Sequence, residues 1–483
     1  MTDYQPSQQW QQSQDELQRV WGYPQFRPLQ GEIVLSILQR KDTLVMLPTG
    51  AGKSLCFQLP ALLQTGLTIV VSPLVALMEN QVQALKTRGA DAALLHSEQS
   101  REQRQQTLNM LARGQLRLLY LSPESLLGAN LWQRLIAPSV KIQTLVIDEA
   151  HCITQWGSSF RPTYRRLGSV RAALLQQQPG SEGQIAIAAF TATADPATQQ
   201  DIRNVLGLKQ PQVFRNSPYR KNLHLKIMRV WTAASRRDRL KQFIQAQGQT
   251  TGLVYTRSRR DSEQLVEWLQ LKGLHTAAYH AGLAPQERRQ IEQQWLSGEI
   301  PFVICTSAFG MGVDKPNVRW VCHFHPPLTL AEYLQEIGRA GRDGQNSQTL
   351  LLASEPTGLL DPTDRQRREG FLKTMRSQSQ LAQTLAQQLP SEGYLPDILK
   401  QEPQAEMALA ILHTQGQLIW ADPFHYRLQA KSATFSESAP QTSIEAYLSE
   451  HGCRWRFLLG AFGFGREAQG LRCGRCDQCQ LSN

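Results

Sequence analysis

A glycine-rich segment near residue 50 carries the residue types that bind a nucleoside triphosphate. It reads LPTGAGKSLCFQLP and follows the apolar run DTLVML. Inward-facing backbone N–H groups and a helix N-terminus attract phosphate, and glycines let it approach. Lys53 would reach the β and γ phosphates, and Ser54 would ligate Mg²⁺. Leu47 replaces the first glycine of the strict pattern, so a chance glycine-rich turn is the alternative. The core of the pattern is intact: Gly50, Gly52, Lys53 and Ser54.

A pair of carboxylates ends a second apolar run, TLVIDEAH, at Asp148 and Glu149. An Asp at the carboxyl end of a central strand can hold Mg²⁺ through water, and the adjacent Glu can polarise an attacking water. An acidic cap at the end of a strand is the alternative interpretation. The upstream phosphate loop favours the catalytic one.

Two arginines lie three residues apart in AEYLQEIGRAGRDGQ, at Arg339 and Arg342. This spacing predicts that both lie on one face of a helix. Two guanidinium groups there could neutralise the charge that develops on a γ-phosphoryl group, as an arginine finger does. A solvated basic helix face is the alternative.

Four of the eight cysteines gather near the C-terminal end of the sequence, and three of them follow a C-x-x-C-x-x-C spacing. Four thiolates satisfy a tetrahedral Zn²⁺ and leave no open position, which predicts a structural zinc site. Free thiols or disulfides are the alternative, although cysteines at two-residue gaps bridge one another poorly. The predicted ligands are Cys453, Cys473, Cys476 and Cys479.

Short apolar runs alternate with helix-length segments from about residue 21 to 353, which predicts parallel sheets covered by helices. A Pro-containing and partly basic stretch at 208–222 interrupts the alternation and is predicted to be a linker between two α/β lobes. The strands predicted before it are 42–47, 67–72, 116–121, 144–148 and 185–190. Those predicted after it are 252–256, 275–279, 301–305 and 318–323.

The pattern changes after about Ser354 to a segment rich in Gln, Arg and Ser. A helix is predicted at 405–417 and two short strands about an Asp-Pro turn at 418–428. A helix followed by a hairpin resembles part of a winged helix, and a plain helical spacer is the alternative. The stretch 431–442 has the composition of a linker.

Composition limits the class of protein. Hydrophobic residues make up 41% and charged residues 19% of the 483 residues, which indicates a folded chain. The polar N-terminus and the lack of a long apolar run predict neither a signal peptide nor a membrane span. A net charge of +11 favours a polyanionic partner such as nucleic acid.

The motifs together carry a specific resemblance. LPTGAGKS, DEAH, FTATAD, TSAFGMGVDKPNVR and QEIGRAGRDG occur in the order and spacing of superfamily 2 helicases. Three further segments make the chain similar to the RecQ family of DNA helicases: GYPQFRPLQ, SPLVALMENQV and DEAHCITQWGSSFRPTY. The similarity covers about residues 21–353 and returns at about 443–483.

The resemblance implies two tandem RecA-like lobes with ATP and Mg²⁺ bound between them, and a small helical zinc-binding subdomain. The expected division of the chain is a polar tail at 1–20, a first lobe at 21–210, a second lobe at 211–355, a divergent insert at 356–442 and the zinc-binding subdomain at 443–483.

The resemblance also assigns nucleotide contacts. In the family the segment before the phosphate loop recognises adenine, so Gln30 would hydrogen-bond the base edge, and Tyr23 and Arg27 would stack near its faces. An ordinary aromatic turn is the alternative. Thr49 and Asp314 are the remaining residues expected to contact the nucleotide.

The segment after DEAH matches the family's aromatic-rich loop, which is expected to sense single-stranded DNA. Trp156 and Phe160 could stack on unpaired bases, and Arg161 could meet a phosphate or its own loop. Trp and Phe at such spacing are more often core residues, but the intervening glycine and serines favour an exposed loop. The family usually has bulkier or acidic residues at Ser158 and Ser159, and this departure bears on how tightly DNA binding is coupled to ATP hydrolysis.

A second departure concerns the family's winged helix, which commonly follows the zinc cysteines, whereas this sequence ends at Asn483. We therefore expect the insert to hold a shortened or displaced substitute, with 418–428 as a strand-separating hairpin.

The expected function is ATP-dependent 3′ to 5′ movement on single-stranded DNA and unwinding of duplex DNA with a 3′ tail, in DNA repair or recombination. Such a protein would be cytoplasmic and nucleoid-associated; the sequence identifies no protein partner. The alternatives are an ATP-gated clamp that does not unwind DNA, and an RNA helicase.

Overall fold

The computed structural model describes residues 8–96, 98–154, 161–177, 185–309, 315–429 and 443–481. The chain forms two compact units, and each is built from separate stretches of sequence. Unit 1 comprises Met1–Leu47, Ala51–Asn216 and Thr374–Ser436. Unit 2 comprises Pro48–Gly50, Ser217–Lys373 and Glu437–Asn483.

Unit 1 contains a seven-stranded sheet in the order β3-β4-β2-β5-β6-β1-β7, and every neighbouring pair is parallel. All five strands predicted for the first lobe are present. The sheet has two more, β3 and β7, and β7 lies within the stretch predicted to be a linker, so that prediction is wrong there. The strands are β1 (Thr43–Met46), β2 (Leu67–Val71), β3 (Ala92–Leu95), β4 (Leu118–Leu121), β5 (Ile142–Ile147), β6 (Ala186–Thr191) and β7 (Gln212–Arg215).

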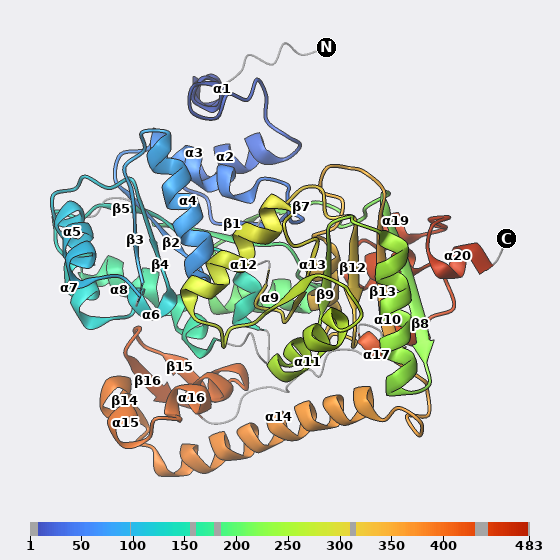
Figure 1. Cartoon of the computed structure of the whole chain (residues 1–483). Coiled ribbons are helices and arrows are strands. Elements are labelled where there is room, and N and C mark those ends of the chain that lie inside the picture. The colour runs from blue at the N-terminus through green and yellow to red at the C-terminus, as the bar shows by residue number, and fades with distance from the viewer. Residues whose placement is uncertain are drawn as a thin grey trace. The chain divides into compact units, whose positions relative to one another are not determined.

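Helices bury both faces of this sheet (Figure 1). Successive strand residues point to opposite faces, so Leu44 and Val45 belong to two separate apolar clusters. The N-terminal residues from Gln8 form a helix, whose Leu17 is buried against Val34 and Leu59. The helices are α1 (Gln8–Trp21), α2 (Gln30–Leu38), α3 (Lys53–Leu63), α4 (Val75–Thr87), α5 (Arg101–Ala112), α6 (Pro123–Leu126), α7 (Ala129–Leu135), α8 (Val170–Gln177) and α9 (Pro196–Val205), with the 3-10 helices η1 (Ala150–Ile153) and η2 (Pro162–Ser169).

Unit 2 contains a six-stranded parallel sheet in the order β10-β11-β9-β12-β13-β8. The four strands predicted for the second lobe are present, and β8 and β13 are additional. The two RecA-like lobes expected from the sequence are thus confirmed as parallel-sheet units. The strands are β8 (Leu223–Val230), β9 (Gly252–Tyr255), β10 (Thr276–Tyr279), β11 (Phe302–Cys305), β12 (Trp320–His323) and β13 (Ser347–Ser354).

The helices of unit 2 include the C-terminal segment that carries the four cysteines. Trp455 and Tyr447 of that segment share an apolar cluster with Leu223 and Tyr333, so the segment packs directly on the lobe. The helices are α10 (Ala233–Gln247), α11 (Arg259–Gln270), α12 (Pro285–Ser297), α13 (Leu330–Ile337), α17 (Ile444–Ser449), α18 (Arg454–Ala461), α19 (Gly465–Ala468) and α20 (Asp477–Leu481).

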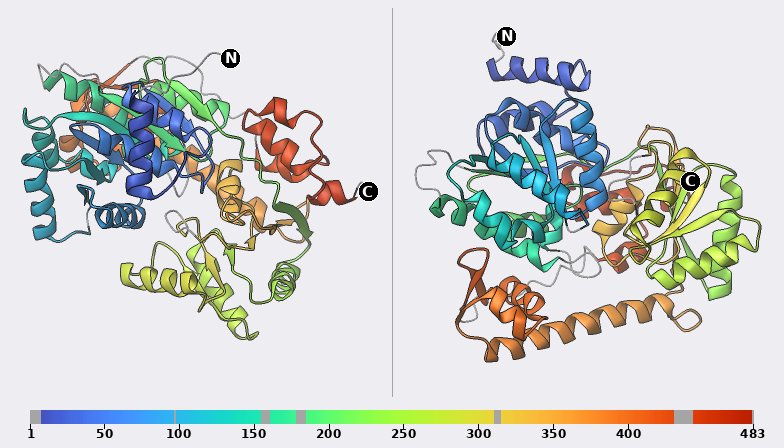
Figure 2. Two further views of the ribbon diagram at one scale, coloured as in Figure 1. Left: turned by 90° about the horizontal axis from the view of Figure 1, so that it is seen from above. Right: turned by 60° about the vertical axis from the view of Figure 1, so that its left-hand side comes forward.

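A small module, residues 374–429, belongs to unit 1 although it follows unit 2 residues in the sequence. It begins within α14 (Thr363–Gln388), an unbroken helix in Figure 2, and continues through β14 (Glu392–Tyr394), α15 (Leu395–Gln401), α16 (Ala405–Thr414), β15 (Leu418–Trp420) and β16 (His425–Leu428). The strands form an antiparallel sheet in the order β14-β16-β15. The predicted helix and hairpin are therefore confirmed.

Among the described residues, every helix is too short or too polar to serve as a membrane span.

Candidate nucleotide-binding and zinc sites

The phosphate loop connects β1 to α3, with Thr49 and Gly50 in the turn between them. Gly52 caps the N-terminus of α3 in the left-handed region, at φ 78°. A Cβ atom there would also lie 2.5 Å from the side-chain nitrogen of Gln30. The backbone conformation therefore favours glycine, and a side chain there would displace the Gln30 amide. The first helical residue is Lys53.

The ends of α3 and β5 bring Lys53 close to the DEAH carboxylates. Lys53 Nζ lies 3.7 Å from Glu149 Oε1, and the Lys53 amine makes no hydrogen bond within the described chain. Asp148 and Glu149 are 5% and 7% exposed. Burial, and then the charge of Glu149, raises the pKa of Asp148 to about 6. A buried amine with this little compensation suits a ligand that brings negative charge, such as phosphate.

Glu149 has an uncommon backbone conformation, with φ 48° and ψ 48° in the left-handed region. A non-glycine residue there is strained, and such strain is concentrated at functional sites. His151 Nδ1 lies 3.2 Å from the Glu149 carboxylate and 3.0 Å from Thr191 Oγ1. Burial lowers the pKa of His151, which favours a neutral ring beside the carboxylate.

Sequence reasoning about individual residues missed several polar neighbours of this cluster. Gln81 Nε2 donates to Ser54 Oγ at 2.9 Å, and Ser72 Oγ donates to Asp148 Oδ2 at 3.4 Å. Ser72 and Gln81 both lie in SPLVALMENQV, the segment that carried part of the family resemblance, so a signal for them was present. They orient the two residues predicted to hold Mg²⁺, Ser54 and Asp148.

The residues predicted to contact adenine lie before and at the start of α2. Gln30 is 4% exposed; its amide donates to Ala51 O at 3.0 Å and accepts from the Arg27 N–H at 3.0 Å. Gln30 therefore holds the phosphate loop in position. Tyr23 is 49% exposed, and Arg27 is also exposed, so both are accessible to a ligand.

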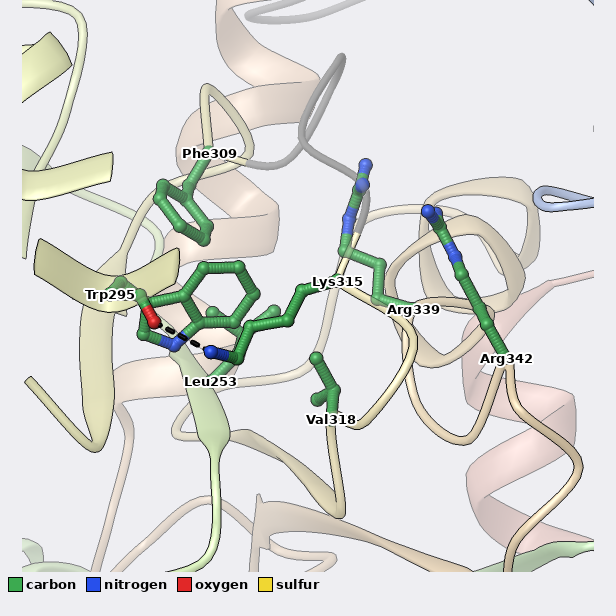
Figure 3. Close-up of a pocket in the computed structure, with 7 residues that line it drawn as sticks. All are labelled: Leu253, Trp295, Phe309, Lys315, Val318, Arg339 and Arg342. Carbon is green, nitrogen blue, oxygen red and sulfur yellow. Dashed lines mark hydrogen bonds between the residues drawn. The ribbon is translucent and has the colours of Figure 1, made fainter. Parts of the chain in front are cut away.

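Unit 2 contains the two candidate arginine-finger residues in the turns after α13 (Figure 3). The prediction of one helical face is wrong, because α13 ends at Ile337. Gly341 then takes φ 58°, and a Cβ there would lie 2.4 Å from Asn222 Nδ2. The side chains of Arg339 and Arg342 nevertheless extend in the same direction, above a small pocket.

Lys315 also lines that pocket. Its amine donates to the carbonyls of Trp295 and Leu296, both at 2.8 Å, and lies over the Trp295 ring. The Lys315 amine is therefore hydrogen-bonded within its own lobe, whereas the Lys53 amine makes no hydrogen bond within the described chain.

Three predicted residues lie outside the described residues: Trp156, Phe160 and Asp314. Arg161, at the edge of the predicted DNA loop, is described. Its guanidinium pairs with Glu124 at 3.4 Å and is 37% exposed.

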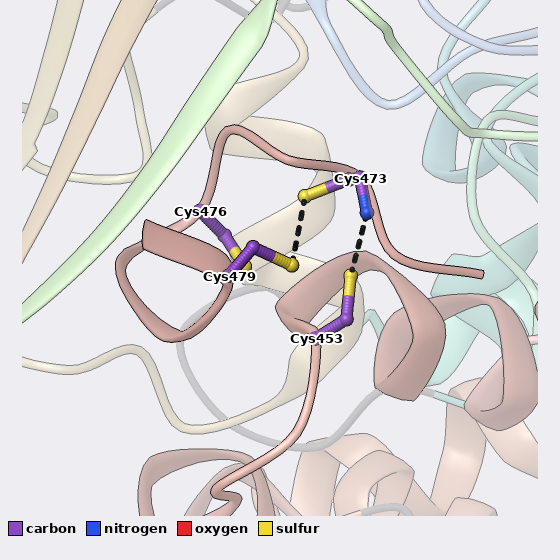
Figure 4. A group of neighbouring side chains, drawn as sticks. All are labelled: Cys453, Cys473, Cys476 and Cys479. Carbon is purple, nitrogen blue, oxygen red and sulfur yellow. Dashed lines mark hydrogen bonds between the residues drawn. The ribbon is translucent and has the colours of Figure 1, made fainter. Parts of the chain in front are cut away.

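The four C-terminal cysteines converge, with all four sulfur atoms within 4.8 Å of one another (Figure 4). Cys453 precedes α18 as its N-cap. The backbone N–H of Cys473 donates to Cys453 Sγ, and that of Arg454 donates to Cys476 Sγ, both at 3.4 Å. N–H groups aimed at sulfur stabilise thiolates, so this donor set fits a structural zinc ion.

The arrangement is held by a buried ion pair. Arg454 donates to both carboxylate oxygens of Asp477, at 2.9 and 3.0 Å, and to the carbonyls of Tyr447 and Glu450. Asp477 lies between two cysteines in the sequence, so this pair fixes one cysteine segment against the other.

Two helicase family models match the chain. The family model described as DEAD/DEAH box helicase matches residues 27–202, and the model described as Helicase conserved C-terminal domain matches residues 235–344. These ranges contain the phosphate loop, the DEAH segment and both arginines.

The family follows from similarity over nearly the whole chain. The sequence is 50% identical over 473 residues to the ATP-dependent DNA helicase RecQ of Synechocystis, covering 97% of this chain and 98% of that protein. The chain belongs to the RecQ family of ATP-dependent DNA helicases. It is also 43% identical to RecQ of Haemophilus influenzae over 69% of this chain, but it spans only about half (52%) of that protein.

Solved structures agree on the fold. The DNA-bound helicase MrfA matches with a TM-score of 0.60 at 18% identity, over 89% of this chain and 60% of that one. The Mycobacterium smegmatis helicase Lhr, bound to single-stranded DNA and AMP-PNP, matches with a TM-score of 0.56 at 19% identity, over 86% and 60% of the two chains.

Proposed function

We propose that the chain is a DNA helicase that uses ATP hydrolysis to move 3′ to 5′ along single-stranded DNA and to unwind duplexes with a 3′ tail. Such an activity would serve DNA repair or recombination. The protein would then act in the cytoplasm, on the nucleoid. The cluster of Lys53, Asp148 and Glu149 carries the proposal, since it joins an incompletely compensated buried amine to two carboxylates. The 3′ to 5′ direction rests on the family resemblance.

Each residue of the site has a proposed role. Lys53 would bind the β and γ phosphates, and Ser54 and Asp148 would hold Mg²⁺, which would neutralise phosphate charge when bound. Glu149 would accept a proton from the attacking water. Arg339 and Arg342 would stabilise charge on the γ-phosphoryl group. Nucleotide contacts are further proposed for Tyr23, Arg27, Gln30, Thr49, Gly50, Gly52 and Asp314.

The DNA contacts proposed are Trp156, Phe160 and Arg161. Aromatic stacking on unpaired bases tolerates any base sequence, which suits a protein that travels along a strand.

Strand displacement tests the proposal. Duplexes with a 3′ tail, a 5′ tail or no tail are incubated with and without ATP, with Lys53→Ala as the inactive control. We expect a displaced strand only with ATP and the 3′ tail. Displacement from the 5′ tail alone would overturn the direction.

Two other outcomes would identify a different function. DNA-stimulated ATP turnover without a displaced strand would indicate a clamp that does not unwind. Stronger stimulation by RNA than by single-stranded DNA would indicate an RNA helicase.

We also propose that Cys453, Cys473, Cys476 and Cys479 bind a structural Zn²⁺. Cys476→Ser should lose bound zinc, measured by metal analysis of the purified protein, and should lower the melting temperature, because metal binding contributes folding free energy. Cys322→Ser, at a buried cysteine far from the cluster in sequence, is the control that should retain zinc.

A further inference from the structure

The module of residues 374–429 contains a helix-turn-helix pair. Helix α15 ends at Gln401 and α16 begins at Ala405, and the pair is completed by the β15–β16 hairpin. In DNA-binding proteins with such a pair, the second helix enters the major groove. Helix α16 would be the corresponding helix here.

Helix α16 instead faces η2 of the same unit. Glu406 Oε1 accepts from Arg166 Nη1 at 2.9 Å and from Thr163 Oγ1 at 3.1 Å. Seven residues later, and so on the same side of the helix, His413 Nδ1 accepts from Arg165 Nε at 3.3 Å. The polar side of α16 is thus occupied by lobe residues.

The hairpin adds contacts to the same arginine. Arg166 Nε donates to Pro423 O at 2.8 Å, and its guanidinium lies 5.5 Å from the Trp420 ring centroid. Phe424 packs edge-on against Trp132 of α7, with ring centroids 5.4 Å apart. Arg166 is only 7% exposed, so its charge depends on these partners.

Helix η2 is also bonded to the DEAH segment. The Tyr164 hydroxyl donates to Asp148 O at 3.2 Å, and Arg165 Nη1 donates to Ile153 O at 3.1 Å. Arg165 therefore bonds both the module and the segment that follows Glu149. The predicted DNA loop ends where η2 begins.

We propose that the module clamps η2 and thereby sets how readily DNA stimulates ATP hydrolysis, with Arg166 and Glu406 as positioning residues. The role in stimulation rests on the proposed function; the docking itself does not. When the clamp is intact, η2 is ordered before DNA binds. When it is broken, DNA binding has to order η2, so more DNA is needed for the same stimulation.

The test measures ATP turnover against single-stranded DNA concentration for Glu406→Ala and Glu406→Gln. The DNA concentration at half-maximal stimulation should rise at least about threefold for Glu406→Ala, within the range seen for coupling mutations, while basal turnover without DNA stays unchanged. Glu406→Gln keeps the side-chain volume and provides the same readout if the alanine variant folds poorly. Glu402→Ala, an exposed glutamate of the same module, is the matched control.

A double-mutant cycle assigns the effect to the pair. Arg166→Ala combined with Glu406→Ala should raise the half-maximal concentration by less than the product of the two single effects, because both remove one interaction. Unchanged DNA dependence in both single variants, or fully independent effects, would overturn the proposal.

A separate readout distinguishes this proposal from the proposed function. If the wild-type chain shows no DNA-stimulated turnover, the proposed function fails. The same cycle is then measured by denaturant unfolding, where non-additive destabilisation would establish the docking and additive effects would refute it.

Discussion

The buried carboxylates of Asp148 in unit 1 and Glu336 in unit 2 have opposite surroundings. Asp148 accepts from the Glu149 N–H at 3.0 Å and from Ser72 at 3.4 Å, and burial beside Glu149 raises its pKa to about 6. Glu336 accepts from Arg257 at 2.7 Å and lies 2.8 Å from His323 Nε2.

These different surroundings shift the pKa values of Asp148 and Glu336 in opposite directions. Despite burial, the adjacent Arg257 and the hydrogen bond from His323 lower the pKa of Glu336 to about 2. The network around Glu336 is internally compensated and holds α13, the helix that leads to Arg339. Around Asp148, the charge of Lys53 lowers the pKa by less than burial or the charge of Glu149 raises it. Burial therefore raises the pKa of Asp148 beside a second carboxylate, whereas Arg257 and His323 keep the pKa of Glu336 low.

The largest expected effect is on ATP turnover. It distinguishes the role of Arg342 from that of the Glu336 network in the same unit. Arg342→Ala should lower kcat for ATP about 10³-fold, as loss of an arginine finger does, while ATP affinity changes little. Steady-state turnover and nucleotide-binding measurements test this, with the exposed Arg365→Ala as control. Full activity would remove the finger assignment.

Glu149→Gln tests whether the carboxylate cluster of unit 1 acts in ATP hydrolysis. If Glu149 is the general base proposed above, its loss should lower kcat for ATP about 10²–10³-fold, with ATP still bound. Thermal stability should change little, because glutamine keeps the side-chain volume and removes one of two adjacent buried carboxylate charges. A marked loss of stability with normal turnover would reverse the comparison.

Glu336→Ala tests whether the Glu336 network of unit 2 stabilises the fold. It leaves Arg257 and His323 buried without their carboxylate, so the free energy of unfolding should fall by about 3–5 kcal/mol in denaturant titrations. Glu332→Ala on the same helix is the matched control and should have a smaller effect, because Glu332 lies 3.8 Å from Arg257 and burial raises its pKa. Equal losses would contradict the distinction.

The smallest expected effect concerns pH and His413. Burial, and then the charge of Arg165, lowers the pKa of His413 to about 3. Above pH 6.5 the His413 ring is neutral in both the folded and the unfolded chain. Below pH 6.5 only the unfolded chain takes up the proton, so the free energy of unfolding decreases as the pH is lowered. The loss should be about 1 kcal/mol per pH unit below 6.5. Denaturant titrations at pH 7 and 5.5 should show it in the wild type and less of it in His413→Gln, whereas exposed His425→Gln should behave as wild type.

Sequence patterns predicted the parts that local chemistry determines. The apolar strands, the phosphate loop and the cysteine spacing each have a short-range signature. Strand β7 has none, because QVFR is mostly exposed at the sheet edge and lacks an apolar run. Helix α13 ends before Arg339, and Gly341 takes φ 58°, which the Arg339–Arg342 spacing alone does not reveal.

The contacts of η2 could not be predicted, because they join residues far apart in sequence. PTYRRL contains two arginines that local rules place at the surface, yet both are buried under the module. Likewise, the bond from Gln30 to the phosphate loop depends on how α2 packs. The motif predicted a nucleotide contact for Gln30 but gave no sign of its bond to Ala51 of the phosphate loop.

The discontinuity of unit 1 has a consequence during translation. Arg166 and Glu406 are 240 residues apart along the chain. At a synthesis rate of about 5–20 residues per second, roughly 10–50 s pass between the emergence of the arginine and that of its partner. During that interval the nascent first lobe lacks the module that buries Arg165 and Arg166, and it is completed only after residues 217–373 of unit 2 have been made.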